Sequence, residues 1–201
     1  MRLRSGPPAY LALGGAIGLA VLAAAVALPA PPGGGSDLPP PARHALRDGR
    51  AELVLPPRSS SVFLFDARQW PTEPWAPAAQ DALESGRWAG AGAGVVSAVM
   101  PFPASRPLPV TVRVVPREPP LERADDHVVD LDLPIDEALA VAGTGAVGAD
   151  FIDVPPGAYR VRIAGQGFRV AEGAERLRID LWPRRGEAPP RVRRRWRGWT
   201  G

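Results

Sequence analysis

The 201-residue sequence lacks several residue types on which common chemistries depend. It contains no cysteine, which excludes a disulfide framework, a thiol nucleophile and cysteine-ligated zinc or iron–sulfur centres. All 24 basic residues are arginine, so no lysine is present to form a Schiff base or to complete a Walker loop. Only two histidines occur, too few for a site in which several imidazoles hold a metal. The sequence therefore predicts neither a metal site nor a cofactor.

Proline and glycine are abundant, with 26 and 22 residues, and they argue against a mainly helical protein. Hydrophobic residues make up 45% of the chain, which is enough to form a packed core. The length fits one ordinary domain, with room for an anchor and a tail.

Charge is concentrated at the C-terminal end. Residues 184–201 hold seven arginines against one glutamate, whereas residues 43–183 hold fifteen arginines against nineteen acids. A nucleic-acid-binding body would need a basic face, which these totals do not supply. The body is therefore not expected to bind nucleic acid, whereas the basic tail could.

Residues 1–30 are typical of a transmembrane anchor or a signal segment. Two arginines precede an uncharged apolar run over residues 10–30, about the length needed to cross a bilayer. One interpretation is a single-pass anchor with the C-terminal domain outside the cytoplasm; the other is a signal cleaved near Ala27, which would release the protein. Residues 31–50, rich in proline and glycine, are expected to form a linker.

Residues 51–183 are expected to form an all-β domain, an antiparallel β-sandwich of roughly eight short strands, preceded by the one N-terminal hydrophobic helix. Apolar and polar residues alternate in the runs, as in half-buried strands, and most prolines fall between them. The expected strands cover residues 51–55, 61–66, 94–100, 108–115, 127–133, 138–142, 159–163 and 176–182. A helix is expected in this body only at residues 78–85.

Opposite charges occupy the outward positions of two expected strands. Asp130 and Asp132 alternate with apolar residues in one run, and Arg160 and Arg162 do so in another. These side chains could face one another across neighbouring strands, each pair contributing a few tenths of a kcal/mol and helping to fix the register. The aspartates could also be calcium or magnesium ligands, but no EF-hand spacing is present, so a solvated strand face is expected.

The stretch from Arg68 to Trp88 is the predicted partner surface, because tryptophan and arginine dominate interface energetics. The predicted partner-binding residues are Arg68, Trp70, Trp75, Arg87 and Trp88. Two alternatives stay open. The acids Glu73, Asp81 and Glu84 beside these indoles could serve an envelope hydrolase or a carbohydrate-binding domain. The tryptophans could also be buried lids on the core.

Residues 184–201 are expected to be a disordered basic tail. Arginine beside tryptophan also suits a membrane interface or another anion. The residues predicted to make such contacts are Arg194, Arg195, Trp196, Arg197 and Trp199. Because the tail lacks apolar periodicity, truncation after Pro183 is expected to cost less than about 1 kcal/mol of stability.

Three segments, residues 126–130, 153–162 and 178–183, together resemble bacterial single-domain proteins similar to the competence protein J (ComJ) nuclease-inhibitor family. In that family a strand with a Val/Ile-Pro-x-Gly-x-Tyr turn leads into the last hairpin, and a loop with tryptophans and acids, here residues 70–88, precedes the third strand. The resemblance covers residues 51–183 and includes no catalytic motif. It implies a β-sandwich that binds and inhibits a partner protein, although the N-terminal apolar run departs from a soluble inhibitor.

The sequence thus predicts a membrane-tethered, non-enzymatic, inhibitor-like module of the bacterial cell envelope. Its partner is expected to be a protein, and its membrane contact is expected to be made through residues 10–30.

Overall fold

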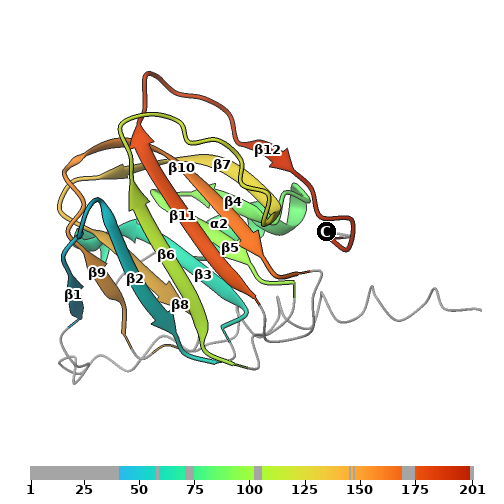
Figure 1. The fold of residues 1–201 in the computed structure, drawn as a ribbon, viewed down its shortest axis with the longest axis horizontal. Helices are drawn as coiled ribbons and strands as arrows, with labels where there is room; N and C mark the ends of the chain where they lie inside the picture. The colour runs from blue at the N-terminus through green and yellow to red at the C-terminus, as the bar shows by residue number, and fades with distance from the viewer. Residues whose placement is uncertain are drawn as a thin grey trace, which may run out of the picture. The chain divides into compact units, whose positions relative to one another are not determined.

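The computed structural model describes residues 41–57, 59–70, 75–101, 106–144, 146, 148–168 and 175–199. All of them belong to the unit that runs from Asp37 to Gly201. Their twelve strands form two six-stranded sheets that pack face to face, as Figure 1 shows.

Sheet A has the strand order β1-β9-β8-β3-β5-β4. Its strands are β1 (Ala42–His44), β9 (Asp150–Ile152), β8 (Leu139–Gly143), β3 (Ser61–Asp66), β5 (Val95–Val99) and β4 (Ala89–Gly92). Neighbouring strands are antiparallel except β1 and β9, which run parallel.

Sheet B has the order β12-β7-β10-β11-β6-β2. Its strands are β12 (Arg191–Arg194), β7 (Asp125–Ile135), β10 (Gly157–Gln166), β11 (Arg176–Pro183), β6 (Leu108–Val114) and β2 (Arg50–Leu55). Here β11 and β6 run parallel, and the other pairs are antiparallel.

The expected all-β fold is confirmed, with two corrections. Each of the eight expected runs forms a strand, but the described residues form twelve strands, because β1, β4, β9 and β12 have only three or four residues and are too short to show alternation. The sheets are mixed rather than antiparallel. The helix expected at residues 78–85 is confirmed as α2 (Trp75–Glu84), which lies inside the domain. The expected N-terminal hydrophobic helix falls outside the described residues.

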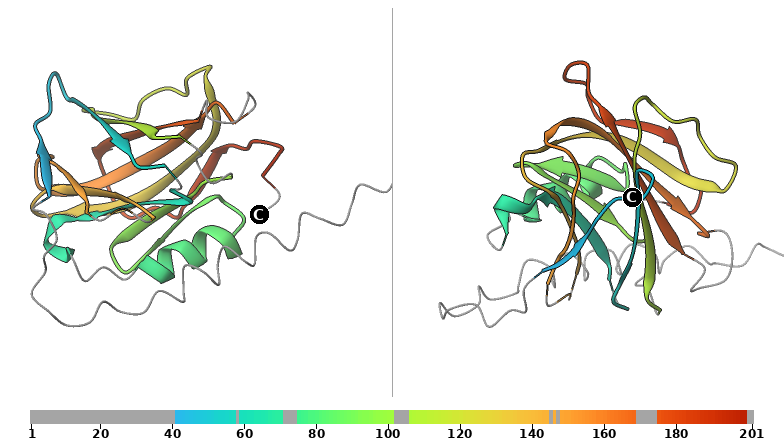
Figure 2. Two further views of the ribbon diagram at one scale, coloured as in Figure 1. Left: turned by 90° about the horizontal axis from the view of Figure 1, so that it is seen from below. Right: turned by 60° about the vertical axis from the view of Figure 1, so that its left-hand side comes forward.

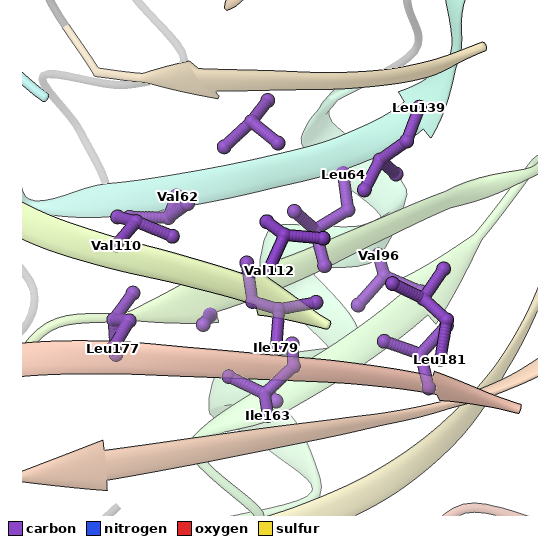
Figure 3. Close-up of a cluster of buried hydrophobic side chains, with 14 of the residues drawn as sticks. Val62, Leu64, Val96, Val110, Val112, Leu139, Ile163, Leu177, Ile179 and Leu181 are labelled. Carbon is purple, nitrogen blue, oxygen red and sulfur yellow. The ribbon is translucent and has the colours of Figure 1, made fainter. Parts of the chain in front are cut away.

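The main core lies between the sheets, where the inward positions of both meet. Figure 3 shows Val62, Leu64 and Val96 of sheet A opposite Val112, Ile179 and neighbouring side chains of sheet B. Burial of each such side chain stabilises the fold by about 1.5–3 kcal/mol. The alternation that predicted the strands thus reflects this interface.

A second apolar cluster covers the outer face of sheet A. Phe63 and Phe65 point outward from β3, and α2 packs over β4 and β5 on that side (Figure 2, left). Gly90 permits this approach, since a Cβ there would lie 2.2 Å from the backbone nitrogen of Ala82. The helix ends at Glu84, and Gly86 follows two residues later with a φ of 61°, which suits the left-handed position that follows a helix.

The membrane prediction is corrected. Across residues 41–199, apart from the short gaps given above, no helix is long and apolar enough to span a bilayer; α2 has only ten residues. This finding contradicts the predicted transmembrane helix and the predicted single-pass localisation, and we do not propose either again. The run over residues 10–30 itself lies outside the described residues.

Two strands fall outside the predicted boundaries of the sandwich. Strand β1 lies in the predicted linker at residues 31–50, and β12 lies in the predicted tail at residues 184–201. The ordered sandwich therefore extends beyond residues 51–183 at both ends.

Candidate binding surfaces

Trp88, one of the five residues predicted to contact a partner, is a core residue. Its side chain is completely buried, with its ring centroid 5.5 Å from that of Phe168 and 5.2 Å from that of His127. Its carbonyl accepts the Val99 N–H at 3.0 Å, which ties it to β5. The prediction is wrong for Trp88, because a partner could reach the indole only by opening the sandwich.

Trp70 and Trp75 cover the aromatic outer face of sheet A and are both half-buried. The Trp75 ring meets Phe63 edge-on, with centroids 4.2 Å apart, and Phe65 at 5.3 Å. Trp70 stacks on Phe65 at 6.4 Å. Each indole therefore packs on the sheet with one side and keeps part of its surface in solvent.

The two predicted arginines differ in freedom. The Arg68 side chain is 57% exposed and pairs with Asp136 and, at 3.2 Å, with Asp66. Arg87 is half-buried and is held by Asp81 at 2.5 Å. Arg68 thus stands beside Trp70 as an accessible cation, whereas Arg87 fixes the end of α2.

The described acids of the Trp-bearing loop have structural roles. Asp81 accepts hydrogen bonds from Arg87 and from the Ala91 N–H at 2.9 Å, which joins α2 to β4. Glu84 is exposed and accepts from the side chain of Gln80 at 2.6 Å. The third acid of the hydrolase alternative, Glu73, lies outside the described residues. Asp81 and Glu84 are thus both engaged in contacts within the fold.

The outer face of sheet B carries a network of ion pairs. The register pairs Arg160 with Asp132 and Arg162 with Asp130, and the sequence predicted that the two arginines face the two aspartates across neighbouring strands. The Arg162 Nε lies 2.7 Å from Asp130, and Arg160 lies 2.7 Å from Asp132. The expected solvated face is wrong, since Arg162 and Asp130 have 0% and 2% exposure.

The network continues across β11 and β6. Arg178 makes a two-pronged contact with Asp125, at 2.7 and 2.9 Å, and also donates to Asp180. Asp180 is completely buried and accepts from Arg113 at 2.5 Å. A buried carboxylate held in this way requires its arginines, because an unpaired charge in the interior is costly.

Arginines keep two carboxylates of this network, Asp125 and Asp132, ionised. Burial alone would raise the pKa of Asp125, but hydrogen bonds from Arg178 and Gln166 outweigh it and hold the pKa below its usual value. Asp132 behaves similarly: burial opposes ionisation, and the hydrogen bond from Arg160 contributes most to lowering its pKa. Both groups are therefore charged at neutral pH.

The cover of this face comes from the segment before β7 and from the tail. Arg194 donates to the carbonyls of Glu122 and Asp125, at 2.8 and 2.6 Å, and Arg193 contacts Glu118 at 2.6 Å. Strand β12 pairs with β7, so the tail continues the sheet (Figure 1). The expectation of a disordered tail is corrected, because its arginines complete the charge pairing.

The predicted membrane or anion contacts separate into two groups. Trp196 and Trp199 pack against the main core, and the Trp199 Nε1 donates to the Gly86 carbonyl at 3.1 Å. With Arg194, they are committed to the fold. Arg195 and Arg197 are exposed, and only they remain accessible to an anion.

His127 lies beneath the tail. The backbone N–H of Trp196 points to its Nδ1 at 3.4 Å, and the side chain has 0% exposure. Burial, followed by the positive charge of Arg195, lowers the pKa of His127 to about 4. The ring is therefore neutral at pH 7.

An open hollow of about 750 Å³ lies beside the charge network, between residues 116–118 and the first half of the tail. Arg117, Arg185 and Arg191 line it. The basic tail was visible in the sequence as a cluster of arginines. Arg117 was missed, because it is an isolated cation that only the fold brings to the tail.

Comparisons with known proteins support the fold. No protein-family model and no curated protein matches the sequence. The crystal structure of ComJ, inhibitor of the DNA degrading activity of NucA, from Bacillus subtilis is 14% identical, with 67% of this chain and 95% of that chain covered and a TM-score of 0.52. Crocagin biosynthetic gene J is 19% identical over 68% of this chain and 97% of that chain, with a TM-score of 0.44. The ComJ resemblance stated from the sequence is confirmed, as a weak likeness of fold.

Proposed function

We propose that this chain is a non-enzymatic protein-binding module that restrains its partner as an inhibitor does. The observation that carries the proposal is the likeness of the fold, over 67% of this chain, to ComJ, which inhibits the DNA degrading activity of NucA. The likeness spans 95% of the ComJ chain, so it includes both sheets rather than one shared hairpin.

The use of the loop acids gives further support. Asp81 is engaged by Arg87 and the Ala91 N–H, and Glu84 by Gln80, so both acids make contacts within the fold. A glycoside hydrolase requires two carboxyl groups that flank one bond. The contacts of the two acids therefore favour binding over catalysis.

The proposed partner surface is formed by Arg68, Trp70 and Trp75. Each indole is held by Phe65 yet keeps part of its surface in solvent, which limits the side-chain entropy lost on binding. Arg68 adds an exposed cation beside them. Tryptophan and arginine are among the residue types that contribute most to the binding free energy of protein interfaces.

The test begins with the full chain as affinity bait and ends with purified components. We expect one recovered protein to form a stoichiometric complex with the chain and to lose activity in it. Arg68→Ala should weaken the complex at least tenfold, whereas Arg47→Ala, an exposed arginine elsewhere, should not. A stoichiometric complex whose partner keeps full activity would contradict inhibition, and turnover of a glycan by the chain alone would favour the hydrolase alternative.

A further inference from the structure

The hollow between the tail and residues 116–118 has a surplus of positive charge. Six arginines line it, and the fold neutralises three of them: Arg160 and Arg184 contact Asp132, and Arg193 contacts Glu118 and Asp130. The other three are Arg117, Arg185 and Arg191. They are exposed, and none contacts an acid among the residues that the structure describes. The rim therefore offers three guanidinium groups to a ligand.

The hollow also has an apolar side. Trp182 lines it with the small exposed part of its ring, and the guanidinium carbon of Arg162 lies 5.3 Å from the ring centroid. Prolines from both walls, including Pro116 and Pro189, add further apolar surface. A ligand that combines anionic groups with apolar groups would use both parts.

The wall formed by the tail is fixed in place. Arg160 donates to the carbonyls of Ala188 and Pro189, both at 2.8 Å, and the Ala188 N–H donates to Asp132 at 3.1 Å. The Arg184 N–H donates to the Ala158 carbonyl at 2.9 Å. Because hydrogen bonds within the chain hold the wall, binding does not have to supply its ordering entropy.

The charge pattern favours carboxylates over a continuous polyanion. Glu118, Asp130 and Glu187 also line the hollow, so negative groups interrupt the basic surface. A nucleic-acid strand places a phosphate at every nucleotide and gains from an uninterrupted positive track. Separate glutamate or aspartate side chains can each take a two-pronged contact from one arginine.

We infer that the hollow binds an acidic segment of the partner protein, with its carboxylates on Arg117, Arg185 and Arg191 and an apolar side chain against Trp182. This inference rests on the proposed function and gives the protein two contact regions, the aromatic surface at Trp70 and Trp75 and this basic hollow.

The test measures, by fluorescence anisotropy at low salt, the affinity of the full chain for a fluorescein-labelled peptide of sequence Leu-Glu-Glu-Leu-Glu-Glu. A peptide with glutamine in place of glutamate and a 12-nucleotide DNA single strand are the comparison probes. The Arg117→Ala/Arg185→Ala/Arg191→Ala triple variant should bind the acidic peptide at least tenfold more weakly. The matched triple Arg47→Ala/Arg106→Ala/Arg176→Ala removes the same charge outside the hollow and should lose less than threefold.

Equal losses in the two triple variants would overturn the inference, because net charge alone would then explain binding. Tighter binding of the DNA strand, or equal binding of the glutamine peptide, would also overturn it, as would no binding of the acidic peptide. Failure here differs from failure of the proposed function. If the partner complex forms normally with the hollow triple variant, the hollow is wrong and the protein-binding proposal stands. If no partner complex exists while the peptide binds in the hollow, the proposed function fails, and only the affinity of the hollow for carboxylates stands.

Discussion

The outer faces of the two sheets are covered by opposite kinds of side chain. On sheet A, Phe63 and Phe65 lie under α2 and two tryptophans, and the contacts are apolar. On sheet B, Arg162, Asp130 and Asp180 lie under the tail, and the contacts are ion pairs. Removal of an apolar side chain from sheet A lowers the stability of the protein according to the apolar area and volume that are lost. Removal of one member of a buried ion pair leaves an unpaired buried charge, which is strongly destabilising. The two faces should therefore respond differently to substitution.

Removal of the tail should have the largest effect on stability. Truncation after Pro183 deletes strand β12, Arg193 and Arg194, together with the packing of Trp196 and Trp199. We expect the free energy of unfolding to fall by at least about 4 kcal/mol, since both buried charge pairing and aromatic packing are lost. Urea unfolding measures this loss. A change below about 1 kcal/mol would restore the expectation from the sequence.

Removal of one charge from the centre of the network should have the next largest effect. Arg162→Met leaves Asp130 buried without its main partner, at a cost of about 3–5 kcal/mol. The double variant Arg162→Met/Asp130→Leu should recover much of this loss, because no buried charge remains. Arg43→Met, which breaks an exposed pair with Glu137, should cost less than about 1 kcal/mol. A double variant no more stable than the single one would argue against an electrostatic origin.

The free energy of unfolding should depend on pH through His127, the buried imidazole beneath the tail. The folded-state pKa of His127 is about 4, below the unfolded value of 6.5, so the unfolded chain binds more protons between these values. The contribution of neutral His127 to stability is fully present above pH 6.5, and the free energy of unfolding should fall by up to about 3 kcal/mol as the pH drops to 4. The carboxylates with lowered pKa, such as Asp125 and Asp132, add further losses below about pH 5, at the acid end of this range and beyond it. In His127→Phe the loss of stability between pH 6.5 and about pH 5 should disappear; its persistence would assign that loss to other groups.

The apolar face of sheet A should be sensitive to volume instead. Gly90→Ala places a methyl group against the backbone of α2, so the helix must shift, and we expect a loss of about 2 kcal/mol. Gly148→Ala is the matched control, because a Cβ there meets nothing within 4 Å. Thermal unfolding of the two variants decides the matter. Equal melting temperatures would mean that the backbone of α2 does not lie in close contact with Gly90 of β4.

The sequence predicted the interior of the sandwich well and its exterior poorly, for physical reasons. Alternation identified strands such as β10 and β11, because their inward side chains meet one interface. That Arg160 and Arg162 face Asp130 and Asp132 across neighbouring strands followed from opposite charges at outward positions, but which arginine faces which aspartate did not. Alternation does not say whether an outward position is solvated, and burial of Arg162 depends on Glu118 and Arg193, which are distant in sequence.

Long-range contacts account for the other errors. The parallel pairing of β6 with β11 joins strands with β7, β8, β9 and β10 between them, and no local pattern records it. The rings of Trp75 and Trp88 come from one loop, yet one ring covers a sheet and the other fills the core. Composition found the loop but could not separate the roles of its tryptophans.

The position of β12 has a consequence for the growing chain on the ribosome. Strand β12 pairs with β7 and follows every other strand in chain order, so it is the last to be synthesised. Until it arrives, β7 is the open edge of sheet B, and an open edge invites strands from other chains. Asp130 and Asp132 of β7, which contact Arg193 and Arg184 once the tail is in place, should oppose such additions, since charged side chains on an edge strand discourage pairing with a foreign strand. The same carboxylates that later receive the tail thus protect the unfinished domain from aggregation.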